Sequence, residues 1–171
     1  MTTEHVDPSN DDLVPVPIQG LATGVQTIAA GGYHTCAITS GSVQCWGWND
    51  GGLLGNNSLT GSSVPVAVQG LPAGARAVAA SWDHTCALVD GAEYCWGSNY
   101  YGELGTGSFV DSLVPVAVQG LPSGVEAIAA GAADTCAIVG GTVMCWGNND
   151  YGELGNGTAT NSNLPVPVQG L

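Results

Sequence analysis

The chain repeats itself every 50 residues, and this period constrains its fold more than any other feature of the sequence. Each copy carries two cysteines nine positions apart, and the second cysteine is always followed by Trp-Gly. The three pairs are Cys36 with Cys45, Cys86 with Cys95, and Cys136 with Cys145. A segment P-V-x-V-Q-G-L closes every copy in the same frame. A fixed period of this length predicts an array of equivalent structural units.

One copy divides into four short segments that favour β-structure. In the second copy, these predicted strands are 75–80, 84–89, 92–96 and 114–121. Asp90-Gly91 separates the middle two and suits a two-residue type I′ hairpin turn. Pro115 restricts the last segment to a sheet edge or a strand end, because proline cannot donate to the ladder. Four strands per unit, repeated, are typical of a β-propeller blade. The sequence therefore predicts an all-β fold of four-stranded antiparallel blades with almost no helix.

The array predicts one domain, residues 13–171, preceded by an acidic, mobile segment at residues 1–12. The domain divides into an opening extra strand and three 50-residue repeats. The opening strand spans residues 13–21, and the repeats span about 22–71, 72–121 and 122–171. Because the array begins and ends with the same strand type, one terminal strand is surplus. This surplus strand could pair with the open edge of a neighbouring chain. The predicted self-association edge comprises Val14, Val16, Ile18, Val166 and Val168.

The spacing of each cysteine pair places its members opposite each other across the predicted hairpin. Opposed residues in an antiparallel pair have position numbers with a constant sum, and Cys86 with Cys95 gives the same sum as Asp90 with Gly91. The two Cα atoms then approach to roughly 4.5 Å, which is compatible with a disulfide. Three disulfides are the favoured interpretation, and they indicate an oxidising compartment. Buried free thiols and a zinc site are the alternatives.

The charge composition excludes two classes of partner. Fourteen acidic residues against a single basic one give a formal net charge of -13. Such a surface repels phosphate backbones and anionic lipid, so no nucleic-acid partner is expected. No apolar run is long enough to span a membrane, and the first residues lack the features of a signal peptide. With the cysteines, this predicts an extracytoplasmic or secreted protein whose export signal is absent from this chain.

Residues 84–107, H-T-C-A-L-V-D-G-A-E-Y-C-W-G-S-N-Y-Y-G-E-L-G-T-G, resemble the repeat of the regulator of chromosome condensation family. Residues 34–47 and 134–147 carry the same pattern. The resemblance implies seven-bladed β-propellers. The family it points to includes a nucleotide-exchange factor that binds chromatin, bacterial relatives with a cysteine pair per repeat, and protein-binding modules. Three repeats cannot close a seven-fold ring. The expected partners are therefore further copies of this chain or further repeats of a longer one.

The sequence contains no recognisable catalytic motif, so we expect no enzyme activity, no catalytic residues and no cofactor. A metal site is not expected; besides zinc at the cysteines, one alternative combines His34, His84 and Asp134, which share a repeat position, and another is calcium binding by the Gly- and Asn-rich loops. Aromatic residues in loops are the best candidates for an interaction surface, because exposed aromatics anchor protein and glycan contacts. These are Trp48, Trp82, Tyr100, Tyr101, Phe109 and Tyr151. The predicted function is a non-enzymatic protein-binding or assembly module, self-associating into a larger propeller, ring or filament. A glycan-binding module is the alternative.

Overall fold

The computed structural model describes residues 15–21 and 23–171, and its regular secondary structure is entirely β-strand. Twelve six-residue strands form three four-stranded antiparallel sheets, which we call blades 1, 2 and 3. Blade 1 contains β1 (Val25–Ala30), β2 (His34–Thr39), β3 (Ser42–Gly47) and β4 (Ser62–Ala67). Blade 2 contains β5 (Ala75–Ala80), β6 (His84–Val89), β7 (Ala92–Gly97) and β8 (Ser112–Ala117). Blade 3 contains β9 (Val125–Ala130), β10 (Asp134–Val139), β11 (Thr142–Gly147) and β12 (Ser162–Pro167).

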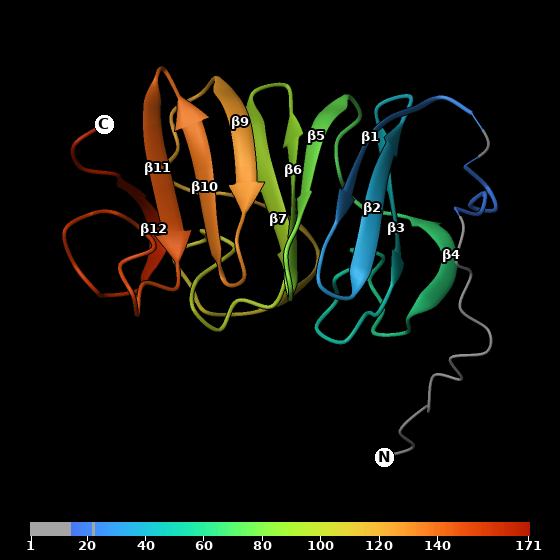
Figure 1. Ribbon diagram of the computed structural model, residues 1–171, viewed down its shortest axis with the longest axis horizontal. Helices are drawn as coiled ribbons and strands as arrows, with labels where there is room; N and C mark the ends of the chain where they lie inside the picture. The colour runs from blue at the N-terminus through green and yellow to red at the C-terminus, as the bar shows by residue number, and fades with distance from the viewer. Residues whose placement is uncertain (1–14, 22) are drawn as a thin grey trace, which may run out of the picture.

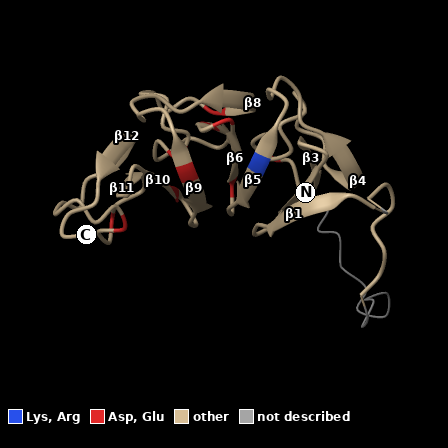
Figure 2. Cartoon of the chain, turned by 90° about the horizontal axis from the view of Figure 1, so that it is seen from above, with Lys and Arg blue, Asp and Glu red and all other residues tan. Residues whose placement is uncertain are grey.

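The three blades stand side by side in chain order (Figure 1). Seen from above, they form an open arc with β1, β5 and β9 on its inner side and β4, β8 and β12 on its outer side (Figure 2). Consecutive inner strands contact each other, β1 with β5 and β5 with β9. Apolar side chains fill the space between neighbouring blades, so the core lies between the sheets. This arrangement confirms the prediction of propeller blades.

The strand predictions for the second copy agree closely with blade 2. β5 and β6 have the predicted bounds, and β7 extends one residue further, to Gly97. The outer strand β8 begins two residues earlier and ends four residues earlier than predicted, at Ala117. The hairpin turn is also as expected, because Asp90 and Gly91 both have positive φ, at 48° and 78°. Such a turn fixes the register of the strands that it joins.

The predicted opening strand over residues 13–21 requires correction, because residues 15–21 form no strand. In every blade the outer strand pairs with the third strand of the same sheet, as β4 pairs with β3. The sequence of the opening segment resembles that of the outer strands. Among the described residues no third strand precedes it, so it has no strand of its own sheet to pair with. The predicted acidic segment, residues 1–12, lies outside the described residues, and so do Leu13 and Val14.

Buried asparagines organise the long loop between the third and fourth strands. The side-chain oxygen of Asn99 accepts the N–H of Leu104 at 2.9 Å. Its amide group donates to the carbonyl oxygens of Ser108 and Val110, both at 3.1 Å. Asn49 and Asn149 make the matching bonds in the other two blades. The asparagine therefore holds a whole loop together, because one side chain satisfies several backbone groups at once.

Candidate functional site

The seam between blades 1 and 2 is closed by a small hydrogen-bond cluster. The Thr85 hydroxyl and the Trp96 indole N–H both donate to the carbonyl oxygen of Leu53, at 2.9 Å each. The His34 Nε2 atom lies 2.7 Å from the same hydroxyl oxygen. Two strands of one blade are thereby tied to the loop and second strand of the preceding blade.

The seam between blades 2 and 3 repeats this cluster 50 residues further on. Thr135 and Trp146 donate to the carbonyl oxygen of Glu103, at 2.9 and 2.7 Å. The His84 Nε2 atom lies 2.9 Å from the Thr135 hydroxyl oxygen, while its Nδ1 atom lies 2.7 Å from the Ser81 hydroxyl. His34 and His84 occupy equivalent repeat positions, and each hydrogen-bonds to the following blade.

The structure separates the residues considered for a metal site. His34 and His84 each face the threonine of the following blade and are engaged there by hydrogen bonds. Burial is the main cause that lowers the pKa of His34 to about 4, so this imidazole is neutral near pH 7. Among the described residues, Cys86, Glu93 and Cys95 form the one group with metal-ligand spacing. Its two cysteines are joined to each other, so this group does not offer free thiolates.

All three cysteine pairs form disulfides, one in each blade. Cys36–Cys45, Cys86–Cys95 and Cys136–Cys145 are directly opposed in their hairpins, with Cα atoms 4.1 Å apart. This confirms the pairing predicted from the constant position sum. The disulfides are consistent with an extracytoplasmic location, because such bonds persist in oxidising compartments. No helix that could cross a membrane is present in the described part of the chain.

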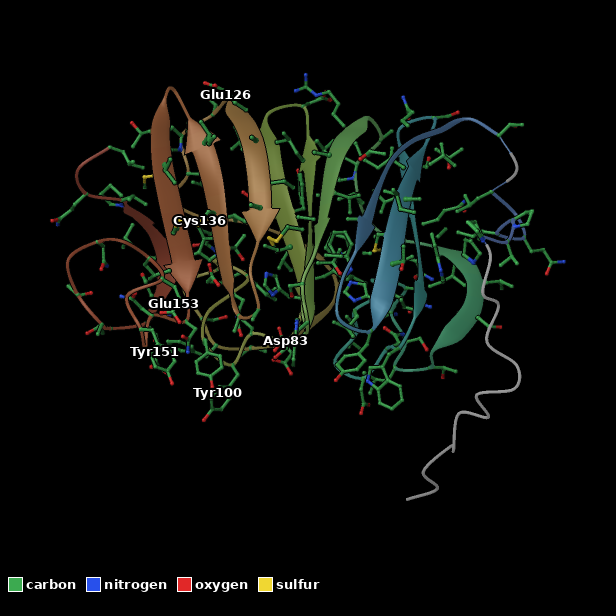
Figure 3. All side chains as sticks on the ribbon, viewed as in Figure 1. Asp83, Tyr100, Glu126, Cys136, Tyr151 and Glu153 are labelled. Carbon is green, nitrogen blue, oxygen red and sulfur yellow. A yellow bond between two sulfur atoms is a disulfide. The ribbon has the colours of Figure 1, made fainter. Side chains whose placement is uncertain are left out.

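The predicted aromatic residues all lie in loops, but they are not equally exposed. Tyr100 and Tyr151 lie at the end of the blades opposite Glu126, the end at which Asp83 also lies (Figure 3). Trp48, Trp82, Tyr100, Phe109 and Tyr151 are more than half exposed, whereas Tyr101 is half-buried. Tyr33 is a further exposed aromatic residue that no sequence pattern singled out, and its ring meets that of Trp82 edge-on with centroids 6.1 Å apart.

The family description of the regulator of chromosome condensation (RCC1) repeat matches residues 40–88, 90–138 and 140–171, and a second description of the same repeat matches residues 25–52. The chain belongs to the RCC1 repeat family. The matched segments begin within the hairpins, so the first two each combine parts of two blades, whereas the third covers only β11 and β12 of blade 3. Among curated proteins, no relative was found.

Several solved structures share this fold. The chain resembles Prp20p from Saccharomyces cerevisiae with a TM-score of 0.77 at 23% identity, covering 86% of this chain and 39% of that one. It resembles human WBSCR16 with a TM-score of 0.75 at 26% identity, covering 85% of this chain and 38% of that one. The crystal structure of Prp20p was described together with its binding to Gsp1p and histones. The chain therefore spans less than two fifths of the length of these relatives.

The first end of the RCC1 arc exposes apolar side chains that the internal seams bury. We call this surface of blade 1 the leading face and define it by Val25, Ile28, Thr35 and Trp46. Val25 is 43% exposed and Ile28 is 57% exposed. Their counterparts in blade 2 are Ala75 and Val78, which pack against blade 1 and are at most 9% exposed.

The last end of the arc exposes the opposite half of the same contact. We call this surface of blade 3 the trailing face and define it by Asp134, Ile138, Val143 and the carbonyl group of Glu153. Ile138 is 38% exposed, whereas Ile38, at the equivalent position, is fully buried against blade 2. An apolar groove of about 220 Å³ runs over this face, near the labelled Cys136 (Figure 3). Its lining is Ala127, Ile128, Ala129, Cys136, Ala137, Ile138 and Val143.

The polar groups of the two faces are complementary as well. Thr35 and Trp46 hold the positions of the two seam donors, and they are only half-buried. Glu153 holds the position of the acceptor, and this residue is exposed, unlike its buried counterparts Leu53 and Glu103. Within the described residues, these donors and this carbonyl oxygen do not meet each other. One end of the chain thus presents seam donors, and the other presents the seam acceptor.

One residue of the trailing face departs from the repeat. Asp134 occupies the position that His34 and His84 hold in the other blades. Burial raises the pKa of the Asp134 carboxyl, and the nearby Glu153 carboxylate raises it further, while His84 acts in the opposite direction. The trailing face therefore carries a titratable acid at the place where the internal seams carry an imidazole.

Proposed function

We propose that this chain is a non-enzymatic assembly module that associates head to tail with further copies of itself. The trailing face of one copy docks on the leading face of the next, which adds three blades to the array at each step. A ring or a filament results, depending on whether successive copies close. The loop aromatics on the end shared by Tyr100 and Tyr151 then form a repeated surface for protein contact.

One observation supports this proposal most directly: the leading face and the trailing face are the two sides of the contact that joins the blades within the chain, and both are exposed. Val25 and Ile28 are large apolar residues on the leading face, and the trailing face offers an apolar groove beside Ile138. The equivalent groups meet twice within the chain, where they are buried. Burying apolar surface of this kind drives protein association, at roughly 25 cal/mol for each Å² removed from water. Hydrogen bonds from Thr35 and Trp46 to the Glu153 carbonyl would set the register of the contact.

Two single-face variants test the head-to-tail geometry. Ile28→Asp places a charge on the leading face, and Ile138→Asp places one on the trailing groove. Each residue is well exposed, so both variants should fold, which circular dichroism checks. Native mass spectrometry of the non-reduced protein should show assemblies for the wild type and monomers for each variant alone. A mixture of the two should form one-to-one complexes, because each variant retains the face that the other has lost.

Other outcomes would contradict the proposal in distinct ways. A wild type that stays monomeric at every concentration would exclude self-association. Assembly of the wild type without complex formation in the mixture would indicate a symmetric contact in place of a head-to-tail one. Tyr100→Ser is the matched surface control, because it removes an exposed aromatic residue from a loop outside both faces and should leave assembly unchanged.

Glycan binding is the second candidate, and the exposed loop aromatics favour it. Trp48, Trp82 and Tyr151 are all more than half exposed at loop positions, and such rings can stack on sugars. A glycan array distinguishes this function from protein assembly. Binding that is lost in Trp82→Ala but retained in Ile138→Asp would support it, whereas an array without signal would exclude it for the glycans present. The three disulfides support an extracytoplasmic site of action for either function.

A further inference from the structure

The proposed seam between two copies differs from the internal seams at one position. In both internal seams a histidine meets the threonine hydroxyl of the following blade, at 2.7 Å for His34 and 2.9 Å for His84. At the trailing face, Asp134 occupies the histidine position. A second copy would bring its Thr35 to this place, because Thr35 is equivalent to Thr85 and Thr135. Whether Asp134 can take the place of the histidine depends on which groups in this cluster have a hydrogen to donate.

Each internal threonine has one hydroxyl hydrogen, and it is already used. Thr85 donates it to the carbonyl oxygen of Leu53, and Thr135 donates its own to that of Glu103. The hydroxyl oxygen can therefore only accept from the imidazole, so His34 must carry a hydrogen on Nε2. The donors and acceptors that meet at this hydroxyl are then matched. This matching is important because an unsatisfied polar group is costly to bury.

The same count at the copy-to-copy seam requires a proton on Asp134. Thr35 of the second copy would donate its hydrogen to the Glu153 carbonyl, leaving its oxygen as an acceptor. A carboxylic acid can donate to it, whereas a carboxylate has no hydrogen to give. Aspartate is shorter than histidine, so the contact is direct or passes through one water molecule. In either form, burial favours the neutral acid.

We propose that Asp134 makes head-to-tail association proton-dependent: the neutral acid docks against Thr35 of a second copy, and the carboxylate opposes docking. This inference rests on the proposed self-association. Asp134 would then regulate assembly from the position at which blades 1 and 2 carry His34 and His84. Assembly should strengthen as the pH falls.

The charged and titratable groups around Asp134 support this direction. In its own copy, Glu153 opposes ionisation and His84 favours it, while burial already raises the pKa of the Asp134 carboxyl. From the second copy, Tyr33 and His34 would face it, as Asp83 and His84 face His34 within the chain. His34 is neutral above about pH 4, since its pKa is lowered to about 4. It therefore supplies no positive charge that would hold Asp134 ionised.

The test measures the association constant by sedimentation of the non-reduced protein at about pH 5 and about pH 8. For the wild type, we expect association at the lower pH to be stronger by about tenfold for each unit by which docking raises the pKa of Asp134 within this pH range. Asp134→Asn is neutral at both pH values and carries N–H donors. It should lose the part of the pH dependence that Asp134 causes and associate at about pH 8 much more strongly than the wild type does at that pH.

Two controls separate this effect from general charge repulsion, which acid also reduces in a chain of net charge -13. Asp50→Asn removes one charge from an exposed loop residue outside both faces, and it should keep the pH dependence of the wild type. Repeating the series at high salt screens repulsion between exposed charges but leaves a buried contact largely unaffected. Thr35→Val removes the partner hydroxyl, so it should reduce the advantage of Asp134→Asn over the wild type to the part that comes from burying a carboxylate.

The outcomes distinguish this inference from the function on which it rests. If neither the wild type nor Asp134→Asn associates at either pH, self-association is wrong and the inference falls with it. If the wild type associates equally well at both pH values, or if Asp134→Asn behaves as the wild type does, the role of Asp134 is wrong while self-association stands. Asp134→His restores the internal pattern and should give strong association at about pH 8.

Discussion

Two buried glutamates show how one residue can alter the chemistry of a repeated seam. Glu103 is fully buried and takes the position that Leu53 holds in blade 1. Glu93 is 2% exposed and takes the position of Val43. Burial raises the pKa of Glu103 to about 7 and raises that of Glu93 well above its usual range. In blade 2, burial therefore shifts two acids toward their neutral form, at positions where blade 1 holds hydrocarbon.

Glu103 should make the stability of the fold depend on pH in the neutral range. Because the folded pKa, about 7, exceeds the ordinary value of 4.5, the folded state binds more protons between these limits. The stabilisation is complete below about pH 4.5 and is lost as the pH rises through about 7. Glu103→Leu should remove this loss and stabilise the protein at about pH 8 by about 1–2 kcal/mol. Urea unfolding of both proteins at about pH 5 and about pH 8 measures the difference.

The Glu103→Leu substitution copies a residue that blade 1 already accepts at this position. The seam acceptor is the backbone carbonyl, so the substitution leaves the bonds from Thr135 and Trp146 in place. Equal gains at both pH values would show that hydrophobic packing, and not ionisation, accounts for the effect.

At the scale of the element, each blade depends on one cross-linked hairpin. Strands β6 and β7 are joined by the Asp90-Gly91 turn and by the Cys86–Cys95 disulfide. The disulfide is completely buried and packs in a cluster that includes Leu104 and is contacted by Ile128 of the next blade. The cross-link therefore stabilises both the hairpin and the surface on which the following blade rests.

Removing that disulfide should weaken the whole array. The double variant Cys86→Ala/Cys95→Ala loses a cross-link over a short loop, and the loop-entropy relation gives about 2–3 kcal/mol. Denaturant unfolding without reductant measures this value. The matched variant Cys136→Ala/Cys145→Ala changes the last blade, where Cys136 is only half-buried, so its packing loss should be smaller. Equal stability of the wild type and the first variant would show that the turn and packing alone hold the hairpin.

At the largest scale, the described residues form an arc whose two ends differ. The leading face offers the donors Thr35 and Trp46, and the trailing face offers the Glu153 carbonyl beside an apolar groove. The strand-edge contact predicted from the sequence would use other residues. Val16 and Ile18 lie outside any strand, while Val166 belongs to β12, paired with Cys145, and Val168 bonds to Val143 in the same blade.

Removing residues 1–19 tests which contact assembles the protein. If the two faces make the contact, the shortened chain should give the same assemblies in native mass spectrometry as the full chain, because Val25 and Ile28 remain. If the opening segment adds a strand to a neighbour, the shortened chain should lose its assemblies. Leu21 is kept in this variant because Leu71 and Leu121, at the equivalent positions, pack against the internal seams.

Short-range patterns in the sequence predict the local structure of this protein. The period, the Asp90-Gly91 type of turn and the placing of Cys86 opposite Cys95 predicted the blades, the hairpin register and the disulfides, and the structure confirms them. These features depend on residues close in the chain, whose steric preferences and strand alternation act at short range.

The contacts that the repeat positions make between blades depend on the tertiary fold. The hydrogen bond from His34 to Thr85 joins residues 51 positions apart, so no local sequence pattern predicts it. The sequence also could not show that Ile38 is buried while its copy Ile138 is exposed, because the difference comes from the presence or absence of a neighbouring blade. Equivalent residues acquire different roles at the ends of the arc, since burial and hydrogen bonding depend on what lies across the seam.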